Sequence, residues 1–313
     1  MNKRIFWLIG FLILLTLCTA YFARKELVFF WERAWVFVSQ RVFPNASSEH
    51  EEFVEIVFLD IGQGDATFIE FPNGEQMLVD CSEDARILES LGRVMNFRDR
   101  VIDYLLVTHP HLDHFGGCID VLKRYTIRNV IWNGYEHEGG QAFSVFLDTL
   151  KKENAQILAI EFEQKLSISS TTFHFLYPDE KMINHDLMKT GKQNLNNTSV
   201  VFSLQFGKQK ILFTGDAEEE LEVYLVKKYG AVLDSDILKA GHHGSHTSSQ
   251  SEFLEQVTPQ ITTISSGKQN EYGHPSPRVL KRLERVGSQV WRTDQKHDIL
   301  IKIYPDHHYV ENS

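Results

Sequence analysis

Three histidines and an aspartate occupy six consecutive positions within the segment LLVTHPHLDHFGG, residues 105–117. The four residues are His109, His111, Asp113 and His114. Imidazole nitrogens and carboxylate oxygens suit zinc, manganese or iron better than calcium or magnesium. Packing alone rarely explains so many metal-binding side chains in one turn, so the segment predicts a metal site.

The flanking residues predict a strand, a ligand loop and a helix, in that order. Residues 104–107 are apolar and β-prone, which is typical of a short buried strand. Side chains two positions apart in an extended backbone point the same way, so His109 and His111 can face one point in space. The next two metal-binding residues follow at a bend and can face a neighbouring point. Residues 115–125 then show helical periodicity.

Two later segments offer partners for these residues. The segment KQKILFTGDAEEE, residues 208–220, predicts a strand that ends in glycine and Asp216. The segment SDILKAGHHGSHTSS, residues 235–249, predicts another strand, followed by His242 and His243. Loops at the C-terminal ends of the strands of a sheet commonly bind ligands, so we expect these residues to complete the site.

In this order, the motifs His-x-His-x-Asp-His, Gly-Asp and His-His-Gly-Ser resemble those of the metallo-β-lactamase fold hydrolases. The resemblance is closer still to the hydrolase domain of bacterial ComEC-type competence proteins. It runs from about residue 54 to residue 303 and includes FLDIGQGDATFIEFPNGEQMLVD (58–80), NNTSVVFSL (196–204) and NEYGHPSP (270–277). Five separate motifs agree, which makes the resemblance specific.

The resemblance implies a centre of two divalent metal ions, zinc or manganese. Its ligands would be His109 and His111 at the first ion, Asp113 and His114 at the second, Asp216 as the bridge, and His242 as the late histidine ligand. His243 is adjacent to His242, and the sequence does not separate the two.

Further positions are implied to surround the ligands. Asp80 resembles the buried aspartate that orients a ligand from behind. Many members of the superfamily place another histidine between the first motif and Gly-Asp, whereas Asn196 and Asn197 stand there in this chain, as in the ComEC-like branch. We therefore expect the first ion to be held less firmly. Asn197, His243 and Ser245 are expected to lie around the ligands or the substrate.

The implied chemistry is hydrolysis by a metal-activated hydroxide. Two cations about 3.5–4 Å apart can share a water and lower its pKa toward 7. Asp113 and His274 are the side chains expected to act in catalysis, His274 as a proton donor. A structural alternative exists for the segment around His274, because Pro275 and Pro277 are well placed to begin a helix at 276–286.

The hydroxyl groups that follow the histidine pair have two interpretations. Ser245, Thr247 and Ser248, with backbone N–H groups near Gly244, could bind phosphate oxygens. Alternatively, they could form the N-cap of a helix at 248–256.

The fold implied by the resemblance is an α/β (α+β) protein, a four-layer αββα sandwich of two mixed sheets. The order of strand pairs and single helices agrees. Strands are predicted at 54–60, 66–71, 76–80, 103–108, 128–132, 172–176, 199–206, 209–214, 235–239, 260–265 and 298–303. Helices are predicted at 84–96, 115–125, 140–153, 217–229, 248–256 and 276–286. The polar segment 177–197 predicts a long loop that could form a wall of the pocket.

The N-terminal residues predict a membrane anchor. Residues 5–23 are uncharged and long enough to span a bilayer. We therefore expect a transmembrane anchor at 1–25, a juxtamembrane helix and linker at 26–52, and the hydrolase domain at 53–313. Residues 26–43 resemble an interfacial helix, or they continue the transmembrane helix.

Other processing of this N-terminus is disfavoured. A cleaved signal peptide needs small residues at its cleavage site, and Cys18-Thr19-Ala20 meets this only partly. Leu17 stands before Cys18 where a lipoprotein would need a small residue. Basic residues flank the apolar stretch on both sides and leave its orientation undetermined. The expected location is the cell membrane, single-pass, with the hydrolase domain extracytoplasmic.

Charge and cysteine content limit the partners. The net charge is −10, which is not the general electrostatic footprint of a nucleic-acid binder. A local basic strip is formed late in the chain by Lys268, Arg278, Lys281, Arg282 and Arg285. Three cysteines give no disulfide framework, and Cys81 and Cys118 are expected to be small core residues.

The favoured hypothesis is a membrane-anchored, metal-dependent phosphodiesterase or nuclease. The resemblance to ComEC-type proteins implies DNA as a substrate during uptake, with a channel supplied by a partner. One alternative is a cell-surface phosphorylcholine esterase or another small-molecule phosphodiesterase. Another is a non-catalytic, membrane-tethered binding module.

Overall fold

The computed structural model describes residues 51–135, 140–179 and 194–312 of the 313-residue chain. The predicted anchor and nearly all of the predicted juxtamembrane segment lie outside these residues, as does most of the predicted loop 177–197. Among the residues that are described, no helix has both the length and the apolar character needed to cross a membrane. Residues Glu52–Ser313 form a compact unit of their own.

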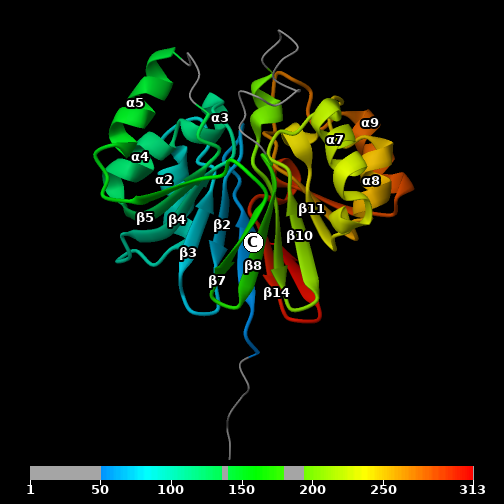
Figure 1. The fold of residues 1–313 in the computed structure, drawn as a ribbon, viewed down its shortest axis with the longest axis horizontal. Coiled ribbons are helices and arrows are strands. Elements are labelled where there is room, and N and C mark those ends of the chain that lie inside the picture. The colour runs from blue at the N-terminus through cyan, green and yellow to red at the C-terminus, as the bar shows by residue number, and fades with distance from the viewer. Residues whose placement is uncertain (1–50, 136–139, 180–193, 313) are drawn as a thin grey trace, which may run out of the picture. The chain divides into compact units, whose positions relative to one another are not determined.

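Two sheets form the centre of this unit (Figure 1). The first has the strand order β15-β14-β1-β2-β3-β4-β5-β6 and mixes parallel with antiparallel pairs. Its strands are β1 (Val54–Phe58), β2 (Thr67–Glu70), β3 (Gln76–Val79), β4 (Val101–Val107), β5 (Thr126–Trp132), β6 (Gln156–Ala159), β14 (Ile299–Ile303) and β15 (His308–Asn312).

The second sheet has the order β13-β12-β11-β10-β9-β8-β7 and is also mixed. Its strands are β7 (Gln164–Ile168), β8 (Thr171–Tyr177), β9 (Val201–Phe206), β10 (Gln209–Phe213), β11 (Ile237–Lys239), β12 (Ile261–Ile264) and β13 (Gln289–Arg292). The predicted pair of mixed sheets is therefore confirmed.

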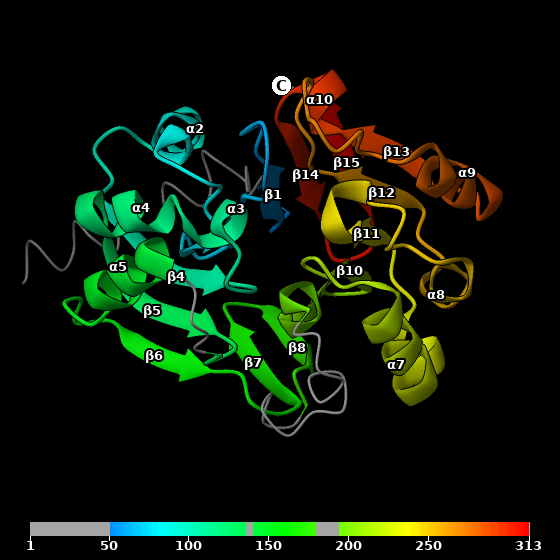
Figure 2. The same cartoon turned by 90° about the horizontal axis from the view of Figure 1, so that it is seen from above.

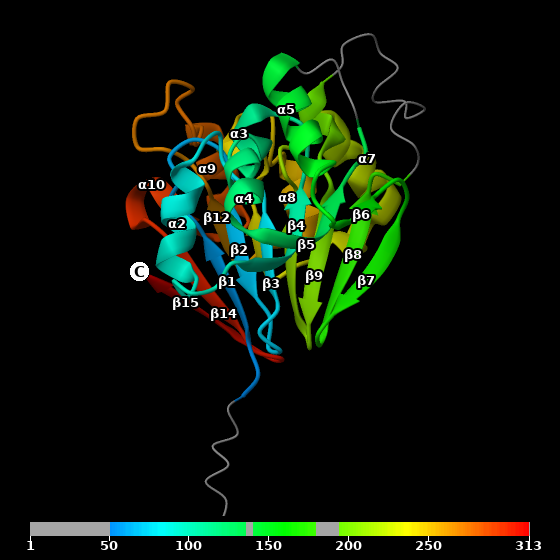
Figure 3. The same cartoon turned by 90° about the vertical axis from the view of Figure 1, so that its left-hand side faces the viewer.

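Helices cover the outer faces of both sheets, as Figures 1 and 2 show. The first sheet carries α2 (Arg86–Val94), α4 (Cys118–Arg124) and α5 (Gly140–Leu150), which lie in front of its strands in Figure 3. The second sheet carries α7 (Glu219–Tyr229), α8 (Ser251–Val257) and α9 (Pro277–Arg285). The four-layer αββα arrangement expected from the sequence is thus present.

A phenylalanine-rich core holds the two sheets together. The ring centroids of Phe202 and Phe213, on neighbouring strands of the second sheet, are 4.7 Å apart. Phe58 of the first sheet reaches across to Phe213 at 6.1 Å. All three side chains are buried. Strands in this position are buried on both faces, which explains why β3 is an uninterrupted buried run rather than an alternating one.

The predicted helix 115–125 is divided in the structure. A short α3 (Leu112–Phe115) ends before two glycines, and α4 begins after them. A Cβ at Gly116 would lie 2.0 Å from the carbonyl oxygen of Glu83, and one at Gly117 would lie 2.2 Å from that of Cys81. The chain passes too close to its neighbour there for any larger residue.

Four strands were not predicted, namely β6, β7, β13 and β15. β15, β6, β13 and β7 are the edge strands of the two sheets. β6 is largely exposed and lacks a clear alternation, so its sequence carries little strand signal.

A disulfide joins Cys81 and Cys118. The prediction that these residues are free core cysteines was therefore wrong, although both are fully buried as expected. The bond connects the residue directly after Asp80 to the first residue of α4. The backbone N–H of Cys81 also donates to the carbonyl oxygen of His114 at 2.8 Å. These two residues are 37 positions apart, and they can pair because the ligand loop returns to the end of β3.

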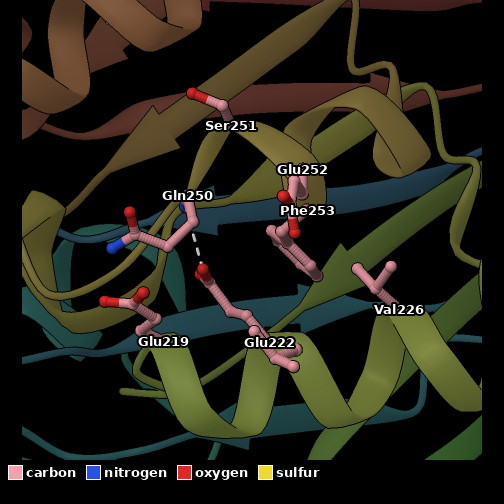
Figure 4. A pocket seen from close by; sticks show the side chains of 8 residues that line it. Glu219, Glu222, Val226, Gln250, Ser251, Glu252 and Phe253 are labelled. Atoms are coloured by element: carbon pink, nitrogen blue, oxygen red, sulfur yellow. Dashed lines mark hydrogen bonds between the residues drawn. The ribbon is translucent and has the colours of Figure 1, made fainter.

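The helix predicted at 248–256 begins three residues later, at Ser251. Ser248 does not cap it, because its hydroxyl donates to the carbonyl oxygen of Ala217 at 2.7 Å. Instead, the buried carboxylate of Glu222 on α7 accepts the backbone N–H groups of Ser249 and Gln250 at 2.5 and 2.9 Å (Figure 4). Glu222 therefore holds the segment that leads into α8, and no side chain caps the first turn of this helix.

Candidate metal centre

Three strand ends deliver the candidate ligands to one place. The first ligand loop follows β4, the Gly-Asp segment follows β10, and the histidine pair follows β11 within the 3-10 helix η4 (Gly241–Gly244). The carboxyl ends of β10 and β11 are adjacent because these strands pair in parallel. Figure 1 shows α3, which carries part of the first loop, at the upper end of the first sheet.

Local backbone geometry sets the direction of Asp216. Gly215 before it has φ 51°, and a Cβ there would lie 2.7 Å from the Ser199 hydroxyl oxygen. That hydroxyl accepts the backbone N–H of Asp216 at 2.9 Å. The turn therefore requires glycine, and it directs a carboxylate that is 1% exposed into the site.

The first ligand group consists of His109, His111 and Asp216. One ligand atom from each lies within 4.8 Å of the others. Nε2 of His109 is 3.1 Å from Nδ1 of His111 and 3.9 Å from Oδ2 of Asp216. The two histidines do face one point, as their spacing predicted.

The second ligand group consists of Asp113, His114 and His243. Nε2 of His243 lies 3.3 Å from Oδ2 of Asp113. Oδ2 of Asp216 is also close, at 3.2 Å from Nε2 of His114 and 3.5 Å from Nε2 of His243. One carboxylate oxygen of Asp216 therefore faces both groups.

The adjacent histidines His242 and His243 occupy different environments. His243 is buried within the second group, whereas His242 belongs to neither group among the described residues. Nδ1 of His242 is 3.0 Å from Oε1 of Glu218, and its Nε2 is 4.0 Å from Oδ2 of Asp216. The sequence favours His242 as the late histidine ligand without separating it from His243, and it is His243 that lies within a candidate ligand group. Both residues have positive φ, which turns consecutive side chains to different sides.

Asp80 lies directly behind His114, where the resemblance placed an orienting carboxylate. Its Oδ2 accepts from Nδ1 of His114 at 2.8 Å and from the Thr108 hydroxyl at 2.7 Å. Its Oδ1 accepts the backbone N–H of Thr108 at 2.8 Å. With Nδ1 donating, Nε2 of His114 is left free to face Asp216.

Asp65 and Lys239 belong to the site but are not identified by the sequence analysis. Oδ1 of Asp65 is 3.4 Å from Nδ1 of His243, and its other oxygen contacts the ammonium group of Lys239. Burial raises the pKa of Asp65, but Lys239 and His243 outweigh that effect and hold it below its usual range. A lysine inside an otherwise apolar strand, SDILKAG, was the available signal.

Several buried polar atoms of the site have no hydrogen-bond partner in the described part of the chain. They are Nε2 of His114, Oδ1 of Asp216, and both ring nitrogens of His243. Buried groups of this kind are ordinarily satisfied, so their convergence fits a cation. Imidazoles and carboxylates together suit a zinc-like or manganese-like ion, and the residues present therefore fit the implied group.

Electrostatics agree with that fit. Burial, and then the neighbouring His114, lower the pKa of His109 well below its usual range, which favours the neutral, ligating imidazole. Burial also disfavours protonated His243, yet Asp216 and Asp65 raise its pKa to about 10. The carboxylates around His243 thus favour a positive charge at this place.

Glu218 is the centre of a hydrogen-bond network at the edge of the site. Its carboxylate accepts from Asn196 Nδ2 at 3.0 Å and from the Thr247 hydroxyl at 3.1 Å, and it contacts His242. Burial raises the pKa of Glu218, but hydrogen bonds from His242 and Asn194 lower it to about 2. The ionised carboxylate thus fixes the ring of His242, a role that sequence reasoning did not identify.

The remaining predicted residues lie around this network rather than among the ligands. Asn197 accepts the backbone N–H of Glu218 at 2.9 Å, and the Ser245 hydroxyl pairs with that of Thr247 at 2.9 Å. The ring of His274 lies 5.7 Å from that of His242. Burial and His242 lower the pKa of His274 to about 4, which keeps its ring neutral near pH 7. Its role as proton donor stays a prediction.

Comparison with known proteins places this geometry in a family context. The model of the metallo-beta-lactamase superfamily matches residues 59–268. ComE operon protein 3 of Bacillus subtilis is 31% identical over 276 residues, which cover 82% of this chain and 34% of that protein. Competence protein ComA of Neisseria gonorrhoeae is 33% identical over 259 residues, covering 82% and 33%. Recombination protein 2 of Haemophilus influenzae is 30% identical over 256 residues, covering 79% and 29%. The chain spans about a third of the length of these curated relatives.

Proposed function

This chain belongs to the metallo-beta-lactamase superfamily, whose members are generally metal-dependent hydrolases, and from that premise we propose that it hydrolyses a phosphodiester with the help of two divalent ions, zinc or manganese. The observation that carries the proposal is the position of Asp216. Its Oδ2 lies within 3.9 Å of a nitrogen of His109 and within 3.5 Å of nitrogens of His114 and His243. One carboxylate shared by two ligand groups is the arrangement that a two-metal site needs.

The chain's own residues divide the work. His109, His111 and Asp216 would hold one ion, and Asp113, His114 and His243 the other. Such a pair of ions, when bound, supplies a water that ionises near neutral pH and neutralises phosphoryl charge. Asp80 fixes the tautomer of His114. These roles rest on the matching motif positions and on the distances given above.

His242 has a different task in this proposal. Glu218 holds its Nδ1, and its Nε2 points to the shared carboxylate from the more open side, where the imidazole is 24% exposed. An imidazole whose Nδ1 donates to Glu218 presents Nε2 as a hydrogen-bond acceptor, which could hold a water next to the substrate. Asn197 and Ser245 support it indirectly, through Glu218 and Thr247.

We further infer that the substrate is DNA and that the setting is DNA uptake. One relative, ComA of Neisseria gonorrhoeae, is a competence protein, and ComE operon protein 3 of Bacillus subtilis is of the same type. We also propose that a partner supplies the channel for such a transport role. The chain's net charge of −10 also favours substrate delivery by a partner over capture from solution.

The predicted anchor at residues 1–25 remains part of the proposal, with the hydrolase domain on the outer side of the cell membrane. The disulfide between Cys81 and Cys118 supports that side, because such bonds persist chiefly in oxidising compartments.

The test is a substrate panel on metal-quantified protein. The full chain, purified in mild detergent and loaded with Mn²⁺ or Zn²⁺, is assayed on bis-p-nitrophenyl phosphate, p-nitrophenyl phosphorylcholine and single-stranded DNA. We expect hydrolysis of the first and third substrates. Turnover of the phosphorylcholine ester alone would assign the chain to the esterase class instead. Full metal loading without turnover of any ester would indicate a binding module.

A matched pair of variants tests the role of Asp216. Asp216→Asn should lower the metal content and reduce kcat by at least about 100-fold, because it removes the negative charge that faces both ligand groups. Asp306→Asn, which neutralises a fully exposed carboxylate, should change neither quantity. Equal activity of the two variants would remove Asp216 from the site.

A further inference from the structure

Tyr272 is unusually exposed for a large aromatic side chain, with 76% of its surface accessible. Other exposed aromatic residues include Phe97 on the α2–β4 connection and Tyr309 on the edge strand β15. A single exposed ring is ordinary in itself. Tyr272 differs from the others in its surroundings, because it lies beside the candidate metal centre.

Three aromatic rings lead from solvent to the shared carboxylate. The ring of Tyr272 is stacked on that of His274, with centroids 5.8 Å apart and planes inclined by 17°. The ring of His274 meets that of His242 at 5.7 Å. Nε2 of His242 is 4.0 Å from Oδ2 of Asp216. Tyr272 is therefore the outermost member of a row that ends at the ligands.

The loop that carries Tyr272 is held in place by its own hydrogen bonds. The side-chain amide of Asn270 donates to the carbonyl oxygens of Gly267 and His274 at 2.8 and 2.6 Å. Its oxygen accepts the backbone N–H of His274 at 2.7 Å. One asparagine thus closes both ends of the loop, so the Tyr272 ring is presented in a defined direction without being covered.

The same loop is packed on the segment that carries the metal ligands. The backbone N–H of Ser276 donates to the carbonyl oxygen of Gly244 at 2.8 Å. A Cβ on Gly244 would lie 2.6 Å from Cβ of Pro275, so the two segments touch directly. Gly244 follows His243 in the chain. The contact with Gly244 therefore holds the Tyr272 loop next to the second ligand group.

An open, fixed aromatic face next to a phosphodiester-cleaving centre suits a nucleobase. Every base has a flat π-face, and stacking on an aromatic side chain binds single strands without reading their sequence. A quaternary ammonium group is the competing ligand for an aromatic ring, but such cations are ordinarily enclosed by a cage of several rings. Tyr272 offers one open face, and the exposed ammonium group of Lys268 belongs to the same loop. The chemistry favours the base.

We propose that Tyr272 is the stacking platform for a base of a single-stranded nucleic acid whose adjacent phosphodiester occupies the metal centre. This inference deepens the proposed function and rests on it for the identity of the cleaved bond. It assigns a base subsite to a residue on a loop that contributes no metal ligand, and it makes the bases, as well as the phosphates, part of what the protein recognises.

The test compares a single-stranded substrate that carries bases with one that lacks them. The full chain, loaded with Mn²⁺, is given an oligothymidylate and an oligonucleotide of equal length made of abasic sites. The wild-type protein should prefer the oligothymidylate. Tyr272→Ala should lower kcat/KM on the oligothymidylate by about five-fold to 100-fold and leave the abasic substrate unchanged. Tyr272→Phe and Tyr272→Trp should retain the preference, because each keeps a ring.

Tyr309→Ala is the matched control, since Tyr309 is also an exposed tyrosine but lies on β15. It should behave as the wild-type protein on both oligonucleotides. Equal loss on both substrates in Tyr272→Ala would mean that the ring only supports the loop, and that result would overturn the proposal. A wild-type protein that does not distinguish bases from abasic sites would overturn it as well.

A binding measurement separates this inference from the proposed function. An oligonucleotide that contains 2-aminopurine loses fluorescence when that base stacks on a ring, whether or not the strand is cut. Quenching by the wild-type protein but not by Tyr272→Ala supports the subsite even if no ester is hydrolysed. Hydrolysis of bis-p-nitrophenyl phosphate without base-dependent quenching or cleavage leaves the hydrolase proposal intact and rejects the subsite.

Discussion

At the scale of single residues, the candidate site depends on the directions in which adjacent side chains point. His242 and His243 are adjacent in sequence and both have positive φ, yet one pairs with Glu218 and the other with the buried ligands. His114 is directed in a similar way by Asp80 behind it. Asp80 therefore fixes which ring nitrogen of His114 faces the candidate metal centre.

Replacing His242 and replacing His243 should have different effects on metal binding. His243→Ala removes a member of the second ligand group, so the metal affinity of that site should fall by more than the roughly 10–100-fold that loss of an outer partner costs. His242→Ala should keep its metal and lose turnover. Metal content of each desalted variant, measured by mass spectrometry, checks both statements. Metal loss in His242→Ala alone would restore His242 as the ligand.

At the scale of elements, two side-chain connections hold the loops that carry the site. The disulfide ties α4 to the residue after Asp80, so the ligand loop between β4 and α4 is closed at its far end. On the other side of the molecule, Glu222 of α7 accepts the first free N–H groups of the segment that starts α8. Both connections join segments that are distant along the chain.

Loss of the disulfide should weaken folding substantially. Cross-linking residues 37 positions apart restricts the unfolded chain, and the chain-entropy estimate for such a loop is about 4 kcal/mol. The double variant Cys81→Ser/Cys118→Ser should therefore have a free energy of unfolding lower by about that amount, as measured by urea denaturation without reductant. The denatured, unreduced wild-type protein should show one titratable thiol, that of Cys18, whereas three would show that the bond is not formed.

Glu222 should make stability depend on pH in a defined direction. Burial raises the pKa of Glu222 to about 8, despite the backbone N–H groups of Gln250 and Ser249 that favour the carboxylate. The folded protein then binds this proton more tightly than the unfolded chain does. The resulting contribution to stability is fully present in acid, below the pKa of an ordinary glutamate, and is lost as pH rises through about 8.

The measurement is the urea midpoint at several pH values between 5 and 8.5. Glu222→Gln cannot titrate, so its midpoint should fall less over this range than that of the wild-type protein. Glu219→Gln, which changes an exposed glutamate on the same helix, should retain the wild-type pH dependence. Parallel curves for Glu222→Gln and the wild-type protein would contradict the assignment.

At the scale of the whole molecule, the residues that stabilise the sandwich and the candidate metal ligands lie in different places. Phenylalanines from both sheets fill the space between them, and the outer helices cover the remaining apolar faces. The candidate ligands all lie on segments that follow strand ends, including α3 and η4, where they can vary without disturbing that core. The net charge of the chain, −10, belongs to the same scale. It would leave the approach of the proposed DNA substrate to local features such as the Tyr272 loop.

Location is the prediction that belongs to this scale. An epitope fused after Ser313 should be removed by protease added to intact spheroplasts, because we place the hydrolase domain outside the cell membrane. A cytosolic protein of the same host should stay protected in the same sample. Protection of the epitope until the membrane is lysed would place the domain inside and would also conflict with a stable disulfide.

The sequence by itself determined the local part of this protein. Periodicity located most of the helices and the inner strands, and motif spacing selected His109, His111, Asp113, His114 and Asp216, because both depend on residues near one another in the chain. Edge strands such as β6 were missed because they are short, exposed and weakly patterned. Gly116 and Gly117 were read as part of a helix because the backbone that approaches them belongs to another segment.

Only the tertiary structure decided which groups meet. The distinction between His242 and His243 depends on Glu218 and Asp113, which reach them from other loops. Asp65, in the connection between β1 and β2 of the first sheet, meets Lys239 on β11 of the second sheet. Cys81 meets Cys118 through the return of the ligand loop. Burial, pairing and the resulting pKa values are properties of distances in space, and a linear spacing rule carries no information about them.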